Sequence, residues 1–473
     1  MSDASPRLAL KETLDAVKGT LFAGAPDVIF SGICTDSRQL KEGNLFVALK
    51  GDNYDGHDYC AKALELGAAG IIISDESKID VSKIKSNGTV IKVTDTLEAI
   101  GDLAYYWRNK FLIPVIGLTG SSGKTTTKEI MAAIIGRQKN ILKTEGNLNN
   151  LIGLPMTIFQ LTNDHEVAIL EMGTNTPGEI KRLTKIAAPD IGVITNIGPA
   201  HLAGFGSIEG VRKEKGDLFA YMNKNGIAVV NMDDENINVI SETWKGQRIS
   251  FGMSPSADVC VKKVDKIGPK GMRFQLMIAG KEYKAETKIA GMQSVVYNAM
   301  AAVAVAQALG IGHETILEGL ASFQPVAGRM EIIKLKNGAY LINDSYNANP
   351  ASTREALMTL KELKSNHNSY AFLGDMLELG EEAREMHRKV GMLAAVTGVN
   401  ALFLRGDFSD ATAAGAAEGG MSSDKIKYLS EIKSDLLPIK ENLKKGDWIL
   451  VKGSRRMKME KIVEQICGDF GCE

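Results

Sequence analysis

A glycine-rich loop between an apolar strand and a helix constrains this chain more than any other feature. Residues 115–118 are apolar and lead into Gly117-Leu-Thr-Gly-Ser-Ser-Gly-Lys-Thr-Thr126, and residues 129–135 belong to a predicted helix. Glycines let consecutive backbone N–H groups converge on phosphate oxygens, and the helix N-terminus adds a partial positive charge. The pattern predicts a nucleotide-phosphate loop within an α/β domain.

Two side chains of this loop have expected roles in binding a nucleotide. Lys124 is expected to reach the β- and γ-phosphates of ATP, and the Thr125 hydroxyl is expected to bind Mg²⁺. The usual spacing of the motif places a glycine at position 118, where Leu118 stands. The predicted ATP-binding residues of the loop are Gly120, Ser121, Ser122, Gly123, Lys124, Thr125 and Thr126.

The length of 473 residues exceeds what one hydrophobic core usually supports, so we expect more than one domain. Apolar, β-rich runs at 167–170 and 191–195 alternate with helical segments, which favours a parallel sheet covered on both faces. A composition change occurs near residues 323–329, and further strands are expected at 339–342, 369–373, 401–404 and 448–451. We predict a three-domain α/β protein divided as residues 1–94, 95–326 and 327–473, with a helix over 97–110 leading into the central sheet and a doubly wound, Rossmann-like sheet in the last domain.

Composition excludes several classes of function. The 56 Lys and Arg residues balance 57 Asp and Glu, so no broad basic field for nucleic acid or an anionic membrane is expected. The longest mostly apolar stretch, 299–309, is shorter than the roughly 20 residues that span a bilayer, and we expect a buried helix there. No signal segment is recognised, which favours a cytoplasmic protein. Five scattered cysteines without a C-x-x-C pair are expected to be reduced thiols.

Two further side chains follow apolar strands and are expected at the same sheet edge as the loop. Glu171 ends the strand at 167–170, where a carboxylate is well placed to hold Mg²⁺. His201 follows the strand at 191–195 and is predicted to bind the metal or a phosphate. A solvent-facing acid and a structural histidine are the alternatives for these two positions.

These segments, in this order and spacing, resemble the Mur ligase family, and the resemblance extends over nearly the whole chain. In that family a lysine fourteen residues after the histidine is carbamylated, which here is Lys215 in Arg212-Lys-Glu-Lys-Gly216. Addition of CO₂ to a neutral amine creates a carboxylate suited to Mg²⁺. Taken without the resemblance, Lys215 would be a solvated helix lysine.

The resemblance also assigns nucleotide contacts in the second half of the chain. Asn298 matches a position that contacts the nucleotide, although Ser294 and Val295 stand where the family usually has His-Asn. Arg329 and Asp344 match segments that close over ATP, with the arginine on phosphate and the carboxylate on the ribose hydroxyls.

Substrate contacts are assigned in the same way. Ser37 and Arg38, in Thr35-Asp-Ser-Arg38, resemble the diphosphate contacts of a UDP-sugar-binding domain, and the alternative is a polar turn. Asn349 lies in Asp344-Ser-Tyr-Asn-Ala-Asn-Pro350, which could instead form only an Asx turn before a helix. Lys452 and Arg455 lie in Val451-Lys-Gly-Ser-Arg455, where a surface salt bridge is the alternative to a substrate contact.

Within the family, residues 344–350 and 374–380 resemble the member that joins D-Ala-D-Ala to UDP-N-acetylmuramoyl-tripeptide. The resemblance implies an ATP-dependent, ADP-forming ligase that works through an acyl-phosphate, with catalytic residues Lys124, Glu171, His201 and Lys215. It also implies Mg²⁺ and a monomer suited to domain motion. The sequence does not distinguish diaminopimelate from lysine as third stem residue. A folylpolyglutamate synthetase, and a nucleotide-gated binding protein without ligase activity, remain the alternatives.

Overall fold

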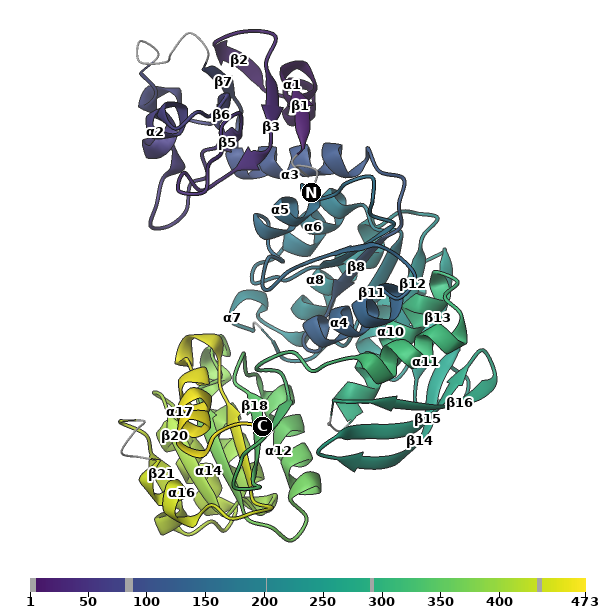
Figure 1. The fold of residues 1–473 in the computed structure, drawn as a ribbon, viewed down its shortest axis with the longest axis vertical. Coiled ribbons are helices and arrows are strands. Elements are labelled where there is room, and N and C mark those ends of the chain that lie inside the picture. The colour runs from purple at the N-terminus through teal and green to yellow at the C-terminus, as the bar shows by residue number, and fades with distance from the viewer. Residues whose placement is uncertain (1–5, 81–87, 201, 290–292, 432–435) are drawn as a thin grey trace.

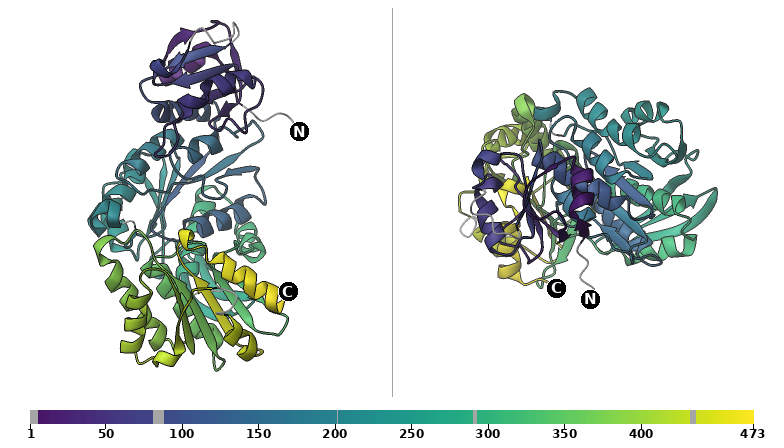
Figure 2. Two further views of the ribbon diagram at one scale, coloured as in Figure 1. Left: turned by 90° about the vertical axis from the view of Figure 1, so that its left-hand side faces the viewer. Right: turned by 90° about the horizontal axis from the view of Figure 1, so that it is seen from above.

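Three α/β bodies follow one another along the longest axis of the molecule in a computed structural model (Figure 1). The structure describes residues 6–80, 88–200, 202–289, 293–431 and 436–473. The N-terminal body lies at one end and the C-terminal body at the other, and the left view of Figure 2 shows the same order. This arrangement agrees with the predicted three-domain α/β fold class, whereas the limits at 94/95 and 326/327 stay a prediction.

The N-terminal body is built on a five-stranded sheet of order β2-β7-β6-β5-β4. β4 to β7 pair in parallel, and β2 joins the edge antiparallel. Helix α2 packs on one face of this sheet and α1 on the other. The elements are β1 (Arg7–Ala9), α1 (Leu10–Val17), β2 (Thr20–Ala23), β3 (Ile29–Ser31), β4 (Ile33–Cys34), β5 (Leu45–Val47), α2 (Cys60–Glu65), β6 (Gly70–Ile73) and β7 (Thr89–Lys92), with β1 and β3 forming a separate pair.

Helix α3 (Thr96–Arg108) joins the first body to the second. Its first turn is capped by Asp95, whose carboxylate accepts hydrogen bonds from the N–H groups of Leu97 and Glu98 at 2.7 and 2.9 Å. The helix packs against α1 of the first body and against α5 (Gly153–Ile158) and α6 (Glu179–Ala187) of the second, and Figure 1 shows it between the two. It corresponds to the helix predicted over 97–110.

The central body carries a nine-stranded sheet of order β16-β15-β14-β13-β12-β11-β8-β10-β9. The six strands β8 to β13 and the start of β14 pair in parallel, and β14 to β16 form an antiparallel meander at one edge. The strands are β8 (Val115–Thr119), β9 (Ile141–Lys143), β10 (Val167–Glu171), β11 (Ile191–Ile194), β12 (Ile227–Asn231), β13 (Gln247–Gly252), β14 (Val259–Gly268), β15 (Gly271–Ile278) and β16 (Lys281–Thr287).

Two layers of helices bury this sheet on both faces. One apolar cluster joins the sheet to α4, α10 and α11, and a second joins it to α3, α5, α6, α8 and α9. α10 contains most of the apolar stretch at 299–309 and is buried, as predicted. Within the described ranges, no helix combines the length and apolarity needed to cross a membrane. The helices are α4 (Lys124–Ile135), α5 (Gly153–Ile158), α6 (Glu179–Ala187), α7 (Leu202–Phe205), α8 (Ile208–Tyr221), α9 (Glu235–Glu242), α10 (Gln293–Ala308) and α11 (His313–Ser322).

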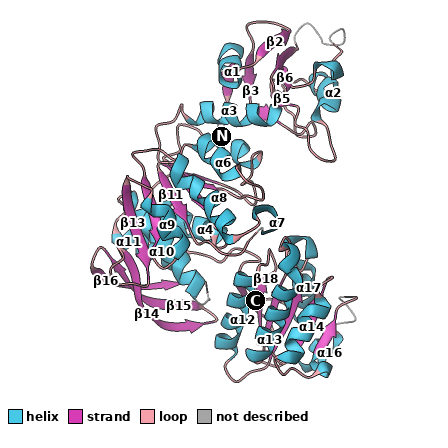
Figure 3. Cartoon of the chain, turned by 180° about the vertical axis from the view of Figure 1, so that it is seen from behind, coloured by secondary structure: helices cyan, strands magenta, loops and turns pink. Residues whose placement is uncertain are grey.

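The C-terminal body has a six-stranded sheet of order β17-β18-β22-β19-β20-β21, parallel except for β17. Helices α12 to α14 cover one face, and α16 and α17 the other; Figure 3 shows the body from behind. The elements are β17 (Glu331–Lys334), β18 (Tyr340–Asp344), α12 (Pro350–Lys364), β19 (Ser369–Gly374), α13 (Ala383–Val396), β20 (Ala401–Arg405), α14 (Ser409–Glu418), β21 (Ile426–Tyr428), α16 (Leu437–Asn442), β22 (Trp448–Lys452) and α17 (Glu460–Phe470).

The cysteines depart from the expectation of five reduced thiols. Cys467 and Cys472 form a disulfide, so the expectation is wrong for these two residues. Their Cα atoms lie 5.4 Å apart because the chain turns back after α17. Cys34, Cys60 and Cys260 are free and buried.

The contact between α13 and α14 depends on two glycines. A Cβ atom added at Gly391 would lie 1.8 Å from the Thr412 carbonyl oxygen, and one added at Gly415 would lie 1.8 Å from the Arg388 carbonyl oxygen. Both neighbours are backbone atoms, so they cannot move aside cheaply.

We therefore expect Gly391→Ala to lower the free energy of unfolding by about 1–3 kcal/mol, since the helices must separate. Gly468→Ala is the matched control, because this glycine lies in α17 with no atom within 4 Å of the added Cβ. The control should stabilise the chain by roughly 0.5–1 kcal/mol. Urea unfolding followed by circular dichroism measures both, and equal midpoints for the two variants would contradict this account of the packing.

Candidate active site

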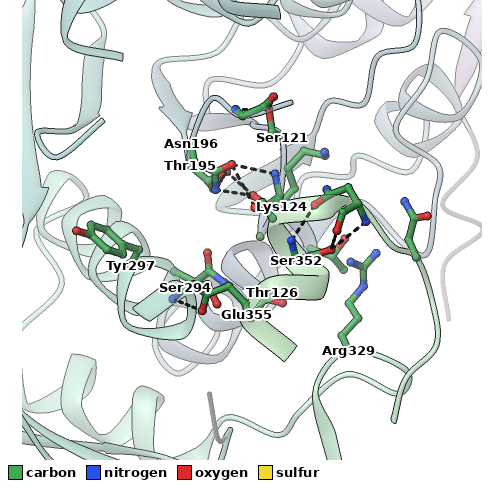
Figure 4. A pocket seen from close by; sticks show the side chains of 18 of the residues that line it. Ser121, Lys124, Thr126, Thr195, Asn196, Ser294, Tyr297, Arg329, Ser352 and Glu355 are labelled. Atoms are coloured by element: carbon green, nitrogen blue, oxygen red, sulfur yellow. Dashed lines mark hydrogen bonds between the residues drawn. The ribbon is translucent and has the colours of Figure 1, made fainter. Parts of the chain in front are cut away.

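A cavity of about 890 Å³ lies between the central and C-terminal bodies. The central body contributes the ends of β8, β10, β11 and β12 and the start of α10, and the C-terminal body contributes the segment before β17, the end of β18 and the start of α12. Figure 4 shows Lys124 and Arg329 lining it from the two different bodies. Because the carboxyl ends of neighbouring parallel strands meet at one sheet edge, this is where ligands bind in such folds.

The predicted phosphate loop lines this cavity and is held by the segment that follows β11. The Ser121 hydroxyl donates to the Gly198 carbonyl at 2.9 Å, and the Ser122 N–H donates to Asn196 Oδ1 at 3.1 Å. The Thr195 hydroxyl donates to the Ser122 carbonyl at 2.6 Å. The loop is therefore fixed by backbone and side-chain contacts from the neighbouring strand.

The two glycines of the loop are required by sterics as well as by backbone angle. Gly120 has φ +151° and Gly123 has φ +77°. A Cβ atom at Gly120 would lie 1.9 Å from Thr195 Oγ1, and one at Gly123 would lie 2.3 Å from Asn298 Oδ1. Asn298, predicted to contact the nucleotide, thus lies directly against the loop.

Lys124 begins helix α4 and curls back over the loop. Its ammonium donates to the Gly120 carbonyl at 2.8 Å. Burial lowers the pKa of Lys124; nearby Glu171 acts against this, and the positive charge of Arg329 adds to it. Two cations from different bodies therefore act on the same region, which favours an anion between them.

Glu171 and Thr125 lie together at the wall of the cavity, as the sequence predicts. The Thr125 hydroxyl donates to Glu171 Oε2 at 3.0 Å, and Asn149 Nδ2 donates to Glu171 Oε1 at 2.9 Å. Glu171 is 2% exposed, and the ammonium of the buried Lys128 lies 3.7 Å from its Oε2. A hydroxyl and a carboxylate are hard oxygen ligands, so this pair fits Mg²⁺.

Lys215 lies inside the protein, on α8, and not on a solvated helix face. It is 1% exposed, and burial lowers the pKa of its ammonium well below the ordinary value, with Lys124 adding to the shift and Glu214 opposing it. A lowered pKa increases the fraction of neutral amine, which is the form that reacts with CO₂. His201, the remaining predicted metal ligand, lies outside the described residues.

The C-terminal body places Arg329 and Asp344 at the cavity. Arg329 lies over the ring of Tyr346, with its guanidinium carbon 4.1 Å from the ring centroid. Asp344 accepts a hydrogen bond from the Met330 N–H at 3.1 Å, and it forms an ion pair with Lys452. Asp344 therefore fixes the turn that carries Arg329.

Lys452 and Asn349 both line the cavity, and both also have structural roles. Lys452 is 2% exposed and pairs with Asp344, so the salt bridge considered for it exists but is buried. Asn349 caps α12, accepting a hydrogen bond from the Ser352 N–H at 2.8 Å. The alternative considered for Asn349, a polar turn at the start of a helix, therefore agrees with its local structure.

Ser37 and Arg38 are not brought to this cavity. They belong to the N-terminal body, where Arg38 has an exposed side chain and forms two hydrogen bonds with the carboxylate of Asp36, at 2.9 and 2.7 Å. These bonds lower the pKa of Asp36 to about 2. Thr35 and Asp36 line a second cavity, of about 590 Å³, together with Phe159 and other residues of the central body.

Three models of known families match successive parts of the chain. The model of the Mur ligase family catalytic domain matches residues 29–108, the Mur ligase middle domain matches 118–306, and the Mur ligase glutamate ligase domain matches 328–455. The chain belongs to the Mur ligase family.

Individual relatives resemble the chain over nearly its full length. A UDP-N-acetylmuramoyl-tripeptide–D-alanyl-D-alanine ligase of Bacillus subtilis is 35% identical over 97% of this chain and 98% of that protein. The protein of the same name from Escherichia coli is 35% identical over 98% and 99%, respectively. A crystal structure of MurF from Acinetobacter baumannii, 32% identical, superposes with a TM-score of 0.88 over 98% of this chain and all of that one. MurF ligase from Thermotoga maritima in complex with ADP, 27% identical, gives a TM-score of 0.83 over 92% and 97%.

Several polar residues of this Mur ligase site were not singled out from the sequence. Asn149 holds Glu171, Asn196 holds the phosphate loop, and Lys128 pairs with Glu171. The sequence could have indicated Asn196, because this residue follows Thr195 directly at the end of a predicted strand. Asn149 lies in an asparagine-rich segment after β9, and its partner is 22 residues away.

Replacing Gly123 tests whether the loop binds a nucleotide. We expect Gly123→Ala to weaken ADP binding more than tenfold, because the added carbon meets Asn298 and the backbone angle favours glycine. Gly268→Ala is the control, since no atom lies within 4 Å of its added Cβ, and it should bind ADP normally. Calorimetric titration measures both, and an unchanged affinity in Gly123→Ala would contradict the assignment.

Proposed function

We propose that this chain is an ATP-dependent, ADP-forming ligase that joins D-Ala-D-Ala to UDP-N-acetylmuramoyl-tripeptide in the synthesis of peptidoglycan precursors. The observation that carries the proposal is the meeting of Lys124, Glu171 and Arg329 at one cavity between two bodies. Relatives that match nearly the full chain bear the name of this activity, and one related structure is described in complex with ADP.

In the first step, a terminal carboxylate oxygen of the tripeptide attacks the γ-phosphorus of ATP, and the bond to the bridging oxygen breaks to release ADP. This step turns a poor electrophile into an acyl-phosphate. Lys124, from the loop, and Arg329, from the facing body, offset negative charge on the transferring phosphoryl group. Their contribution is mainly electrostatic and positional.

In the second step, the amine of D-Ala-D-Ala attacks the acyl carbon. The tetrahedral intermediate loses inorganic phosphate, and the amine loses a proton as the amide forms. No covalent intermediate on the protein is needed. The C-terminal body covers the phosphate loop in this account, and closure of the two bodies protects the acyl-phosphate from water.

The proposal assigns a metal site to Thr125, Glu171, His201 and a carbamylated Lys215. These residues would hold Mg²⁺, which offsets charge on the phosphate oxygens when bound. In carbamylation, the neutral Lys215 amine forms a bond to the carbon of CO₂ and releases one proton. The burial of Lys215 supports this assignment.

The substrate contacts of the proposal extend over all three bodies. Ser37 and Arg38 are assigned to the diphosphate of the UDP-sugar, and Asn349 and Lys452 to the acceptor side of the cavity. The proposal further assigns the enzyme to the cytoplasm, where ATP is available, and expects a monomer, which leaves its bodies free to close over the substrates.

An omission assay tests the proposed activity. Purified protein is supplied with ATP, Mg²⁺, UDP-N-acetylmuramoyl-tripeptide and D-Ala-D-Ala, and each component is left out in turn. We expect ADP release to require both substrates and to match the pentapeptide formed. Release that is indifferent to the dipeptide would overturn the proposal.

Substitution of Lys215 tests the carbamate. We expect Lys215→Ala to reduce kcat at least a hundredfold, and added acetate to restore part of it by supplying a carboxylate. Lys213→Ala is the control, because Lys213 lies on the same helix with an exposed side chain. Full activity in Lys215→Ala would show that the carbamate has no role.

A further inference from the structure

An accessible disulfide joins the last turn of helix α17 to the segment that follows it. Cys467 lies in that turn, Cys472 lies beyond the end of the helix, and their sulfur atoms are bonded. Cys472 is exposed, whereas Cys467 is partly buried. A reagent in solution can therefore reach the bond from the Cys472 side.

The other three cysteines differ from this pair in their accessibility. Cys34, Cys60 and Cys260 are free and buried, and burial raises the pKa of each of these thiols. A raised pKa leaves less of the thiolate, which is the reactive form of cysteine. Within the described residues, thiol chemistry from solution is therefore directed to Cys467 and Cys472.

The disulfide holds residues 471–473 beside the chain at the end of β17. The Lys336 N–H donates to the Gly471 carbonyl at 3.1 Å, and the Glu473 N–H donates to the Lys334 carbonyl at 2.9 Å. β17 is the outermost strand of its sheet. The segment therefore covers part of an edge whose backbone groups would otherwise be open to solvent.

The noncovalent contacts that hold this segment in place are weak. They include an antiparallel bridge between Cys472 and Leu335 and an ion pair between Glu473 and Lys334. Both side chains of the ion pair are about half exposed, and such a pair contributes little to stability. Ordering the segment has an entropic cost, which the disulfide lowers by restricting the segment before it docks. The position of residues 471–473 therefore depends on the disulfide.

The proposed cytoplasmic location exposes this bond to reductants. Thiols are kept reduced in that compartment, and the disulfides that form there are usually transient, catalytic or redox-sensing. Exposed disulfides are also the ones that reductants open most readily. A bond between Cys467 and Cys472 is therefore expected to open and close there, and not to act as a permanent crosslink.

We propose that Cys467 and Cys472 form a thiol–disulfide exchange site, and that its oxidised form clamps residues 471–473 on the edge of the C-terminal sheet. In the reduced form, this segment leaves β17. The inference rests on the proposed function for the cytoplasmic location of the chain. It adds a redox-controlled element outside the active-site cavity, which neither cysteine lines.

The exchange uses a dithiol as reductant. A thiolate of the dithiol bonds to Sγ of Cys472, the bond to Sγ of Cys467 breaks, and Cys467 leaves as a thiolate that takes up a proton. The second thiol of the dithiol then loses its proton and displaces Cys472, which takes up a proton in turn. Two electrons pass to the cysteine pair, and the dithiol becomes a disulfide.

A redox titration of the purified full chain tests the exchange. The chain is equilibrated in mixtures of reduced and oxidised dithiothreitol, free thiols are alkylated with iodoacetamide, and mass spectrometry locates the label. We expect Cys467 and Cys472 to gain and lose label together and reversibly, while the buried cysteines stay unlabelled in the folded chain. A pair that stays oxidised in reduced dithiothreitol, or that does not reoxidise, would overturn the proposal.

Hydrogen exchange followed by mass spectrometry tests the clamp. Reduction of the unmodified chain should speed exchange at least tenfold in the peptides that contain the Lys336 and Glu473 amides, because these amides lose their partners. The peptide of β22 should exchange at an unchanged rate, since this strand lies inside the sheet. Equal rates at Lys336 and Glu473 in the oxidised and reduced chain would show that the disulfide does not hold the segment.

Cys472→Ser is the matched variant, because the replaced side chain is exposed and the core is left unchanged. It should show the fast exchange of the reduced chain both with and without dithiothreitol. A variant that keeps the slow exchange of the oxidised chain would also overturn the proposal. Neither measurement uses turnover, so failure to make pentapeptide would refute the proposed function alone.

Discussion

The close approach of the phosphate loop to its neighbours is the constraint on which the rest of the site depends. Gly120 lies against Thr195 from the end of β11, and Gly123 lies against Asn298 from α10. A side chain at either glycine would separate the loop from the strand and from the helix. Because these contacts are made at the carboxyl edge of the central sheet, where Thr125 also holds Glu171, the loop, Glu171 and Asn298 are fixed together.

Two cations from different bodies, Lys124 and Arg329, line the cavity and act on one another. Lys124 and Glu171 line the cavity from the central body, Glu171 opposes the lowering of the Lys124 pKa, and the positive charge of Lys124 acts on the buried Lys215. Arg329 adds a further cation from the C-terminal body. Lys124 and Arg329 repel each other, so an anion bound between them would offset this repulsion and favour contact between the two bodies.

The sequence predicts those parts of the structure that depend on residues close together along the chain. β8, β10 and β11 of the central sheet and β18, β19, β20 and β22 of the C-terminal sheet were predicted because they are continuous apolar runs, whereas the parallel strands β9, β12, β13 and β21 were not. Lys124 was singled out because its motif is contiguous. The meander β14 to β16 was missed, since its polar and apolar residues alternate and no motif marks it. The buried pair of Lys452 and Asp344 joins residues 108 positions apart, and the contact of Tyr346 with Arg455 joins two loops. Such contacts arise only when the strands are placed side by side.

The transfer of oxygen from substrate to phosphate tests the central claim most directly. The terminal carboxylate of UDP-N-acetylmuramoyl-tripeptide is labelled with ¹⁸O, the reaction is run with ATP and D-Ala-D-Ala in unlabelled water, and the released phosphate is analysed by mass spectrometry. An acyl-phosphate predicts one ¹⁸O atom in each phosphate, because the attacking carboxylate oxygen leaves with phosphorus. Phosphate without label, formed alongside the pentapeptide, would contradict the account.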